Sequence, residues 1–143
     1  MRFVVLNGVN LDVVGRRDPE LYGGLTLSEL ETRIYEWASE LDCTVRCRQT
    51  NSEGEYVDWC HDALDWADGA VLNPGAWSHY SWAIHDAVEL FTVPVVEVHL
   101  SDVTAREEWR KFSVLEGLVA ERVIGKGPGG YREALELLTK SAS

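Results

Sequence analysis

This sequence has few basic residues, few cysteines and no long apolar stretch. Only 13 residues are Lys or Arg against 24 Asp or Glu, which gives a formal net charge of −11 and a pI near 4.7. So acidic a chain argues against nucleic acid or an anionic membrane as a partner. No run of 18 or more apolar residues occurs, so the sequence predicts no membrane-spanning helix.

The three cysteines, Cys43, Cys47 and Cys60, form an odd set, and the chain opens on a strand-like segment without a signal-peptide pattern. We therefore expect a cytoplasmic protein with reduced, buried or half-buried thiols. His61 follows Cys60, but no CxxC or HxxxH spacing accompanies the pair. We expect no bound metal.

With 143 residues, 45% of them hydrophobic, the chain can bury a core, and we expect residues 1–143 to form a single domain. Extended and helical patterns alternate throughout. The expected strands are 3–6, 44–49, 69–73, 93–100 and 118–124, and the expected helices begin at capping signals at Thr26, Ser52 and Thr104 or cover about 78–90 and 131–140. This alternation predicts an α/β fold: a flavodoxin-like, doubly wound, five-stranded parallel sheet with helices on both faces.

Polar and titratable side chains follow the predicted strands. In such a fold, ligands bind beyond the carboxyl ends of the strands, near the switch point in strand order. The residues at these ends are Asn7, Asn10, Arg17 and Tyr22 after the first strand, Gln49, Asn51 and Glu53 after the second, Asn73 and His79 after the third, and Glu97, His99, Ser101, Arg106 and Arg110 at and after the fourth. The clustering predicts a ligand site at this edge of the sheet.

The glycine-rich segment after the first strand carries Arg17 and Tyr22. Loops held by a rigid sheet carry much of protein chemistry. Because a nearby cation stabilises a phenolate, Arg17 would make Tyr22 a usable base.

Glu97 and His99 lie two residues apart in a predicted strand and therefore share a face. Glu97 could fix the tautomer of His99 and favour its charged form, which would make His99 a general acid. A purely structural histidine is the alternative.

Other motifs also keep two interpretations. The turn from Asn73 to His79 is either an anion-binding turn or a helix cap with a solvated histidine. Asp86, taken by itself, is typical of an exposed charged residue on the solvent face of a helix. The segment 125–130 is rich in glycine but lacks the spacing of a phosphate loop, and we expect a turn there.

Five separated segments resemble known family patterns, in the same order along the chain. Asn7–Leu11 resembles N-G-P-N-L, Arg17–Gly23 resembles R-E-P…Y-G, and Gln49–Trp59 resembles Q-S/T-N-S-E-G-E-L…W. Asn73–Ala87 resembles N-P-G-A-Y-T-H…D-A, and Glu97–Arg110 resembles E-V-H-L-S-N…A-R-E-E-F-R. These are the patterns of type II 3-dehydroquinate dehydratase, the small dehydroquinase of the shikimate and quinate pathways. The match runs from about Val4 to Tyr131, nearly the whole chain.

The resemblance implies a lyase that dehydrates 3-dehydroquinate to 3-dehydroshikimate by anti elimination through an enolate. Tyr22, as phenolate, would take the proton alpha to the ketone, held by Arg17, and Asn10 would support the enolate through a bound water. His99 would protonate the departing hydroxyl, with Glu97 orienting its ring. The residues implied to bind the substrate are Asn73, His79, Asp86, Leu100, Ser101 and Arg110.

The resemblance also implies an assembly. The family forms homotrimers, often four together as a homododecamer, in which Asp86 would reach the site of a neighbouring subunit. The loop carrying Arg16 and Arg17 would close over the substrate as a lid. No organic cofactor, metal or Schiff-base lysine is implied.

The chain departs from the family pattern at a few positions. Val9 replaces a usual proline, Asp102 and Thr104 stand where Asn and His are common, Val114 replaces a frequent tyrosine, and His85 a frequent arginine. Asp102 and Thr104 motivate one alternative, a paralogue that dehydrates a substituted analogue such as aminodehydroquinate. A non-catalytic flavodoxin-like binding or receiver domain is a remote second; it predicts an acidic cluster or a hydroxyl-rich phosphate loop where this chain has Asn-Gly-Val-Asn.

Overall fold

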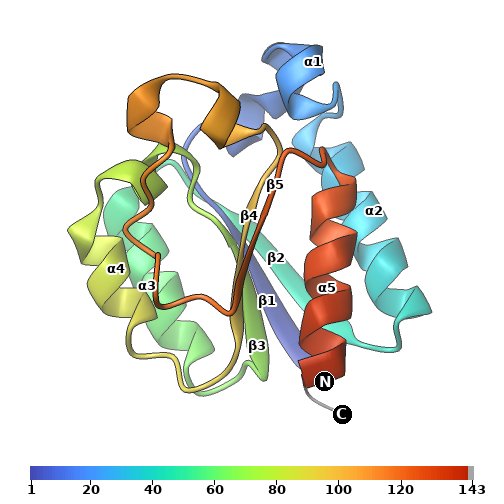
Figure 1. Ribbon diagram of the computed structural model, residues 1–143. Helices are drawn as coiled ribbons and strands as arrows, with labels where there is room; N and C mark the ends of the chain where they lie inside the picture. The colour runs from blue at the N-terminus through green and yellow to red at the C-terminus, as the bar shows by residue number, and fades with distance from the viewer. Residues whose placement is uncertain (142–143) are drawn as a thin grey trace.

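A computed structural model describes residues 1–141 and shows an α/β fold around one parallel sheet (Figure 1). The strands are β1 (Arg2–Asn7), β2 (Thr44–Gln49), β3 (Gly69–Asn73), β4 (Val95–His99) and β5 (Glu121–Ile124). Their order, β2-β1-β3-β4-β5 with every neighbouring pair parallel, is the flavodoxin-like order and confirms the predicted fold class. Ala142 and Ser143, which end the expected domain, lie outside the described residues.

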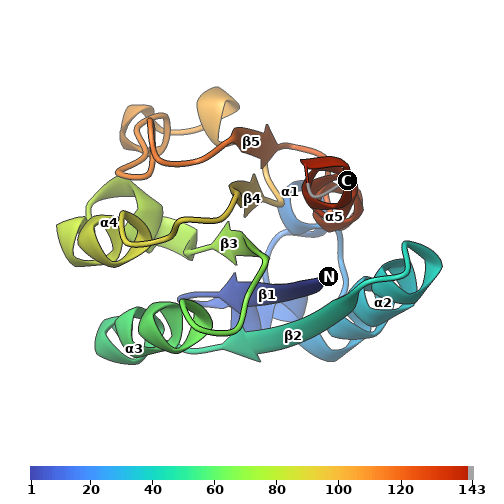
Figure 2. The ribbon, with the colours of Figure 1, turned by 90° about the horizontal axis from the view of Figure 1, so that it is seen from below.

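Helices cover both faces of the sheet. They are α2 (Leu27–Glu40) and α5 (Gly129–Ser141) on one face, and α3 (Glu53–Ala63) and α4 (Trp82–Val88) on the other (Figure 2). In β1, Phe3 and Val5 pack into the cluster shared with α2 and α5, whereas Val4 and Leu6 pack toward α3 and α4. The strand is apolar throughout because both of its faces are buried. Within residues 1–141, every helix is too short or too polar to cross a membrane.

The predicted helix starts are right in two cases and wrong in one. Thr26 and Glu29 form a complete capping box at the start of α2. Ser52 caps α3 by accepting from the Glu55 backbone N–H, but its own N–H donates to the Thr50 hydroxyl. The cap expected at Thr104 is wrong: the Asp102 carboxylate caps the short 3-10 helix η3 (Val103–Ala105) and accepts from the Thr104 N–H and hydroxyl. A carboxylate two residues earlier in the chain thus competes successfully for these donors.

Other element boundaries differ from the expectation. The helix expected over 78–90 is divided into the 3-10 helix η2 (Gly75–His79) and α4, because Ser81 begins a new helix by accepting from the Ile84 N–H. The strand expected over 118–124 begins only at Glu121. Leu118 and Val119 instead pack against the core cluster beside α3 and α4. The turn expected over 125–130 is present, with Gly125 and Gly127 at positive φ before α5 begins.

The connection after β1 contains more helix than expected: the 3-10 helix η1 (Leu11–Arg16) and the short helix α1 (Pro19–Tyr22). From β1 the chain moves to β2 on one side, and from β3 it moves to β4 on the other. The loops after β1 and β3 therefore diverge and leave a crevice at the carboxyl ends of the two strands.

Candidate active site

A cavity occupies this crevice at the carboxyl ends of β1, β3 and β4. It holds about 560 Å³ of space outside the protein atoms, a volume that includes the solvent of its open mouth. The predicted site residues among those that line it are Asn10, Arg17, Tyr22, Asn73, His79, His99, Leu100, Ser101 and Arg110. The fold thus brings together residues that are up to 100 positions apart in the chain.

Tyr22 lies at the end of α1 with its phenol group buried in the cavity wall. The Arg17 Nη2 donates to the phenol oxygen at 2.5 Å, and the Arg17 Cζ lies 3.9 Å from the ring centroid. The Arg106 Nη1 donates to the same oxygen at 2.7 Å. Two guanidinium groups on one phenol oxygen stabilise negative charge there.

Arginines concentrate positive charge at this cavity within an otherwise acidic chain. Burial lowers the pKa of Arg17, and the like charges of Arg106 and Arg110 lower it further, against the opposing effect of Tyr22. Three guanidinium groups therefore act on one another across a small volume. Such a site favours an anionic ligand despite the formal net charge of −11.

The contact of Arg106 with Tyr22 was not anticipated from the sequence. Arg106 was placed at this edge of the sheet, but only Arg17 was expected to hold the phenol. The two contacting residues are 84 positions apart, and no local pattern reports such a pairing. Arg106 also donates to the Ser101 hydroxyl at 3.2 Å, so one guanidinium group contacts both Ser101 after β4 and Tyr22 of α1.

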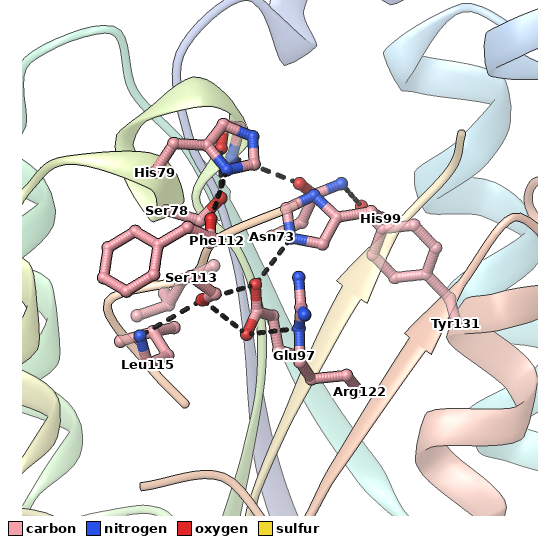
Figure 3. A network of polar contacts seen from close by, with 12 residues as sticks. Asn73, Ser78, His79, Glu97, His99, Phe112, Ser113, Leu115, Arg122 and Tyr131 are labelled. Carbon is pink, nitrogen blue, oxygen red and sulfur yellow. Dashed lines mark hydrogen bonds and ion pairs between the residues drawn. The ribbon is translucent and has the colours of Figure 1, made fainter. Parts of the chain in front are cut away.

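His99 and Glu97 share a face of β4 as expected, and they form a short hydrogen bond. The His99 Nε2 lies 2.6 Å from the Glu97 Oε2. Figure 3 shows two further groups converging on the same carboxylate: the Ser113 hydroxyl, at 2.9 and 3.0 Å from its two oxygens, and the Arg122 Nε, 3.3 Å from Oε1. Neither Ser113 nor Arg122 was singled out from the sequence.

The charge state of Glu97 follows from these partners. Its side chain has no exposed surface, and burial alone would raise its pKa. The hydrogen bond and charge of His99, the charge of Arg122 and the hydroxyl of Ser113 together outweigh burial and hold the pKa of Glu97 below its ordinary value. A carboxylate acceptor on Nε2 leaves Nδ1 as the ring nitrogen of His99 that remains for a ligand.

His79 approaches the cavity from η2, and its ring stacks on that of His99 with the centroids 6.0 Å apart. Its Nδ1 lies 2.7 Å from the Phe112 carbonyl oxygen. Because a carbonyl only accepts, this contact assigns the proton to Nδ1 and leaves Nε2 as an acceptor. Burial lowers the pKa of His79, so the neutral ring is favoured.

Asn73 is held in place by a buried tyrosine. Its Nδ2 donates to the Tyr131 hydroxyl at 2.8 Å, and that hydroxyl donates to the Asn7 Oδ1 at 2.6 Å. The Asn73 Oδ1 accepts from the Gly75 N–H at 3.2 Å. These contacts fix the orientation of the amide at the cavity wall, and the contribution of Tyr131 was not visible in the sequence.

Asn10 stands at the cavity mouth in a left-handed backbone conformation, with φ of 69°. Its N–H donates to the Asn51 Oδ1 at 2.9 Å, which links the first connection to the segment after β2. Arg110 also lines the cavity, with 16% of its side chain exposed, and its Nε is 2.5 Å from the Glu107 carboxylate.

Asp86 is the one predicted site residue that stands away from the cavity and from the groups around Glu97. It lies on α4 with 78% of its side chain exposed, and its carboxylate is 2.9 Å from the His85 Nδ1. Its expected role in the site of a neighbouring subunit stays a prediction. Asp102 also faces away, since its carboxylate is engaged by Thr104 outside the cavity lining.

The cysteines behave as expected: all three are free thiols, with Cys60 buried and Cys43 and Cys47 half-buried. Within the part of the chain that the structure describes, no group of three His, Cys, Asp or Glu side chains is arranged to hold a metal ion.

Comparison with known proteins identifies similar sequences and structures. The family described as dehydroquinase class II matches residues 1–139. A 3-dehydroquinate dehydratase of Pelotomaculum thermopropionicum is 45% identical over 94% of both chains, and that of Bacillus subtilis is 44% identical over 95% of this chain and 92% of its own. The crystal structure of type II dehydroquinase from Propionibacterium acnes superimposes with a TM-score of 0.93 at 43% identity, covering 97% of this chain and 96% of that one.

Proposed function

Because this chain belongs to the class II dehydroquinase family, whose reaction is the dehydration of 3-dehydroquinate, we propose that Tyr22 is the base and His99 the acid of that reaction in this protein. The observation that carries the proposal is that one cavity holds two titratable groups whose surroundings favour opposite charges. Two guanidinium groups hold the Tyr22 oxygen, and a buried carboxylate holds the His99 ring. These environments favour a negative oxygen and a positive ring respectively.

The first step is proton removal. The Tyr22 phenolate takes the proton alpha to the substrate ketone and becomes a neutral phenol, while the electrons of the broken C–H bond move into an enolate. Arg17 and Arg106 are in place to stabilise the phenolate before this transfer. Asn10, at the cavity mouth, supports the enolate through a bound water.

The second step is loss of the hydroxyl group. His99 donates the Nδ1 proton to the departing oxygen, the carbon–oxygen bond breaks, and the enolate electrons form the conjugated double bond. The products are 3-dehydroshikimate and water. A proton then returns to His99 and one leaves Tyr22, which restores the starting state without any net gain or loss of protons.

The rest of the cavity wall binds the substrate. Asn73 and His79 present an oriented amide and a neutral imidazole, and Ser101 adds a hydroxyl group next to the Leu100 backbone. Arg110, which also lines the cavity, supplies a cation for the substrate carboxylate.

An absorbance assay tests this assignment. The purified protein is incubated with 3-dehydroquinate, and growth of the conjugated-enone absorbance is followed for the parent, Tyr22→Phe and a control, Tyr80→Phe. Tyr80 is 60% exposed and outside the cavity. We expect Tyr22→Phe to lose about 10²–10⁴-fold in kcat, or about 3–5 kcal/mol, and the control to match the parent. A fully active Tyr22→Phe would remove Tyr22 as the base.

The two alternatives find no support in the cavity. Asp102, which motivated a substituted substrate, is occupied in capping η3. Equal or better turnover of 3-dehydroquinate than of aminodehydroquinate would exclude the hypothesis that the analogue is the substrate. Asparagines and arginines line the cavity where a flavin or receiver domain would need hydroxyl or acidic groups.

Assembly belongs to the same proposal. A homotrimer, or a homododecamer of four trimers, would let Asp86 complete the cavity of a neighbouring subunit. Its exposed carboxylate on α4 supports this role, as does the exposed aromatic side chain of Trp82 beside it. Sedimentation analysis tests the assembly, and a monomer that turns over substrate at the full rate would contradict it.

A further inference from the structure

Arg122 is a charged residue on β5, the partly exposed edge strand of the sheet. The strand register places it directly beside Glu97 of β4, whose side chain is fully buried. Neighbouring residues in register point to the same face of the sheet. The Arg122 Nε consequently lies 3.3 Å from the Glu97 Oε1 (Figure 3).

The environment of Glu97 makes this cation important. The Glu97 side chain has no exposed surface, and that of Arg122 is 23% exposed. A buried carboxylate without a partner is strongly disfavoured. Ser113 offers a neutral hydroxyl, and His99 offers a positive charge only while it is protonated. A guanidinium group keeps its charge throughout the physiological pH range, so Arg122 still balances Glu97 after His99 has given up its proton.

We propose that Arg122 is a positioning residue for the dehydration: it keeps Glu97 ionised throughout the catalytic cycle and thereby keeps the mobile proton on His99. The inference rests on the proposed role of His99 as the acid. If Glu97 took the proton, it would donate to the His99 Nε2 and leave a neutral imidazole, which is a much weaker acid. With Glu97 ionised, the proton that returns after each turnover instead restores the imidazolium.

Other titratable groups face the pair but do not supply this charge. His79 of η2 stacks on His99, and burial lowers its pKa, which favours the neutral ring. Tyr56 of α3 is fully buried, and burial raises its pKa. The charge of Glu97 raises it further, so Tyr56 stays neutral. Arg110 of the 3-10 helix η4 (Glu108–Arg110) acts on His79 and is engaged by Glu107.

The pH dependence of turnover tests the proposal. Removing a cation raises the proton affinity of every group near it, so the limb of the kcat profile that reports the His99–Glu97 pair should move to higher pH in Arg122→Gln. We expect kcat at neutral pH to fall about tenfold, a part of the about 10²–10⁴-fold that a general acid contributes. KM should change little because Arg122 does not line the cavity.

Two matched variants serve as controls. Arg122→Lys keeps a positive charge and should restore a profile close to that of the parent. Arg132→Gln removes an arginine whose ion pairs with Glu40 and Glu136 lie far from the cavity, and its profile should superimpose on that of the parent. A folded Arg122→Gln with an unshifted profile overturns the proposal.

A double-mutant cycle separates action through Glu97 from a general structural effect. In a Glu97→Gln background, Arg122→Gln should cause no further loss of kcat, whereas an equal loss in both backgrounds overturns the proposal. If Arg122→Gln does not fold, NMR of the parent decides instead. The Glu97 carboxylate carbon should keep its ionised chemical shift while His99 titrates, and a protonated Glu97 in that range overturns the inference. An inactive parent would refute the proposed function, whereas an active parent with an unshifted variant would refute this inference alone.

Discussion

Replacing Tyr131 by phenylalanine removes a single buried oxygen atom that contacts the cavity-lining Asn73, and it tests how Asn73 is oriented. That oxygen accepts from the Asn73 Nδ2 at 2.8 Å and donates to the Asn7 Oδ1 at 2.6 Å. Tyr131 and Asn7 have no exposed surface. Burial raises the pKa of Tyr131, so its hydroxyl group keeps its proton and acts as a donor.

The expected loss follows from the two groups that the substitution leaves unpaired. Each buried donor or acceptor without a partner costs about 1–3 kcal/mol. The Asn7 Nδ2 already has no hydrogen-bond partner among the described residues, so turning this amide over offers no compensation. We expect the free energy of unfolding to fall by about 2–6 kcal/mol. KM for the substrate should rise as well, because the Asn73 amide loses the contact that aims it at the cavity.

Urea unfolding, followed by circular dichroism and tryptophan fluorescence at one fixed protein concentration, measures this change. The control is Tyr80→Phe, which removes a hydroxyl from a side chain that is 60% exposed, and it should stay within about 0.5 kcal/mol of the parent. A Tyr131→Phe variant as stable as this control, with an unchanged KM, would refute the reasoning.

Two further predictions concern glycine positions in the backbone and the loss of folding stability at acidic pH. A Cβ added at Gly8 would lie 2.4 Å from the Pro74 backbone oxygen, whereas one added at Gly54 in α3 meets no atom within 4 Å. In thermal unfolding, Gly8→Ala should therefore lose about 1–3 kcal/mol and Gly54→Ala should gain about 0.5–1 kcal/mol; changes of the same sign would contradict this. Because the pKa of Glu97 is lowered below its ordinary 4.5 on folding, the unfolded chain binds more protons than the folded one below that pH, and stability falls as the pH is lowered. Glu97→Gln removes this contribution, so the free energy of unfolding should depend less steeply on pH below 4.5, and identical slopes for the two proteins would be evidence against it.

Much of the fold was predictable because it depends on patterns that are local in the chain. The apolar segments of β1 and β3 are bounded by polar or glycine-containing turns, and a complete capping box at Thr26 starts α2. The element boundaries that were predicted wrongly depend on competition between nearby residues for the same backbone hydrogen bonds. Asp102 took the capping position expected for Thr104, and Ser81 interrupted an otherwise helical pattern. A sequence pattern lists several possible hydrogen-bond acceptors, and only the folded backbone shows which one is within reach.

The contacts of the candidate site also fall into those that the sequence predicts and those that it does not. Tyr22 with Arg17, and Glu97 with His99, are five and two residues apart, so chemical type and strand period were enough to pair them. Arg106, Ser113 and Tyr131 reach their partners across 84, 16 and 58 or more positions. No periodicity connects residues at such separations.

The sequence by itself determined the alternation of strands and helices and the edge of the sheet where polar side chains gather, and its family resemblance suggested the proposed acid and base. Tertiary structure alone decided which charged groups surround them. The second guanidinium on Tyr22 comes from the segment after β4, and the cation beside Glu97 comes from the register of β5 with β4. The physical reason is that charge state depends on burial and on neighbours within a few ångströms. Those neighbours are set by the packing of distant segments and not by their order along the chain.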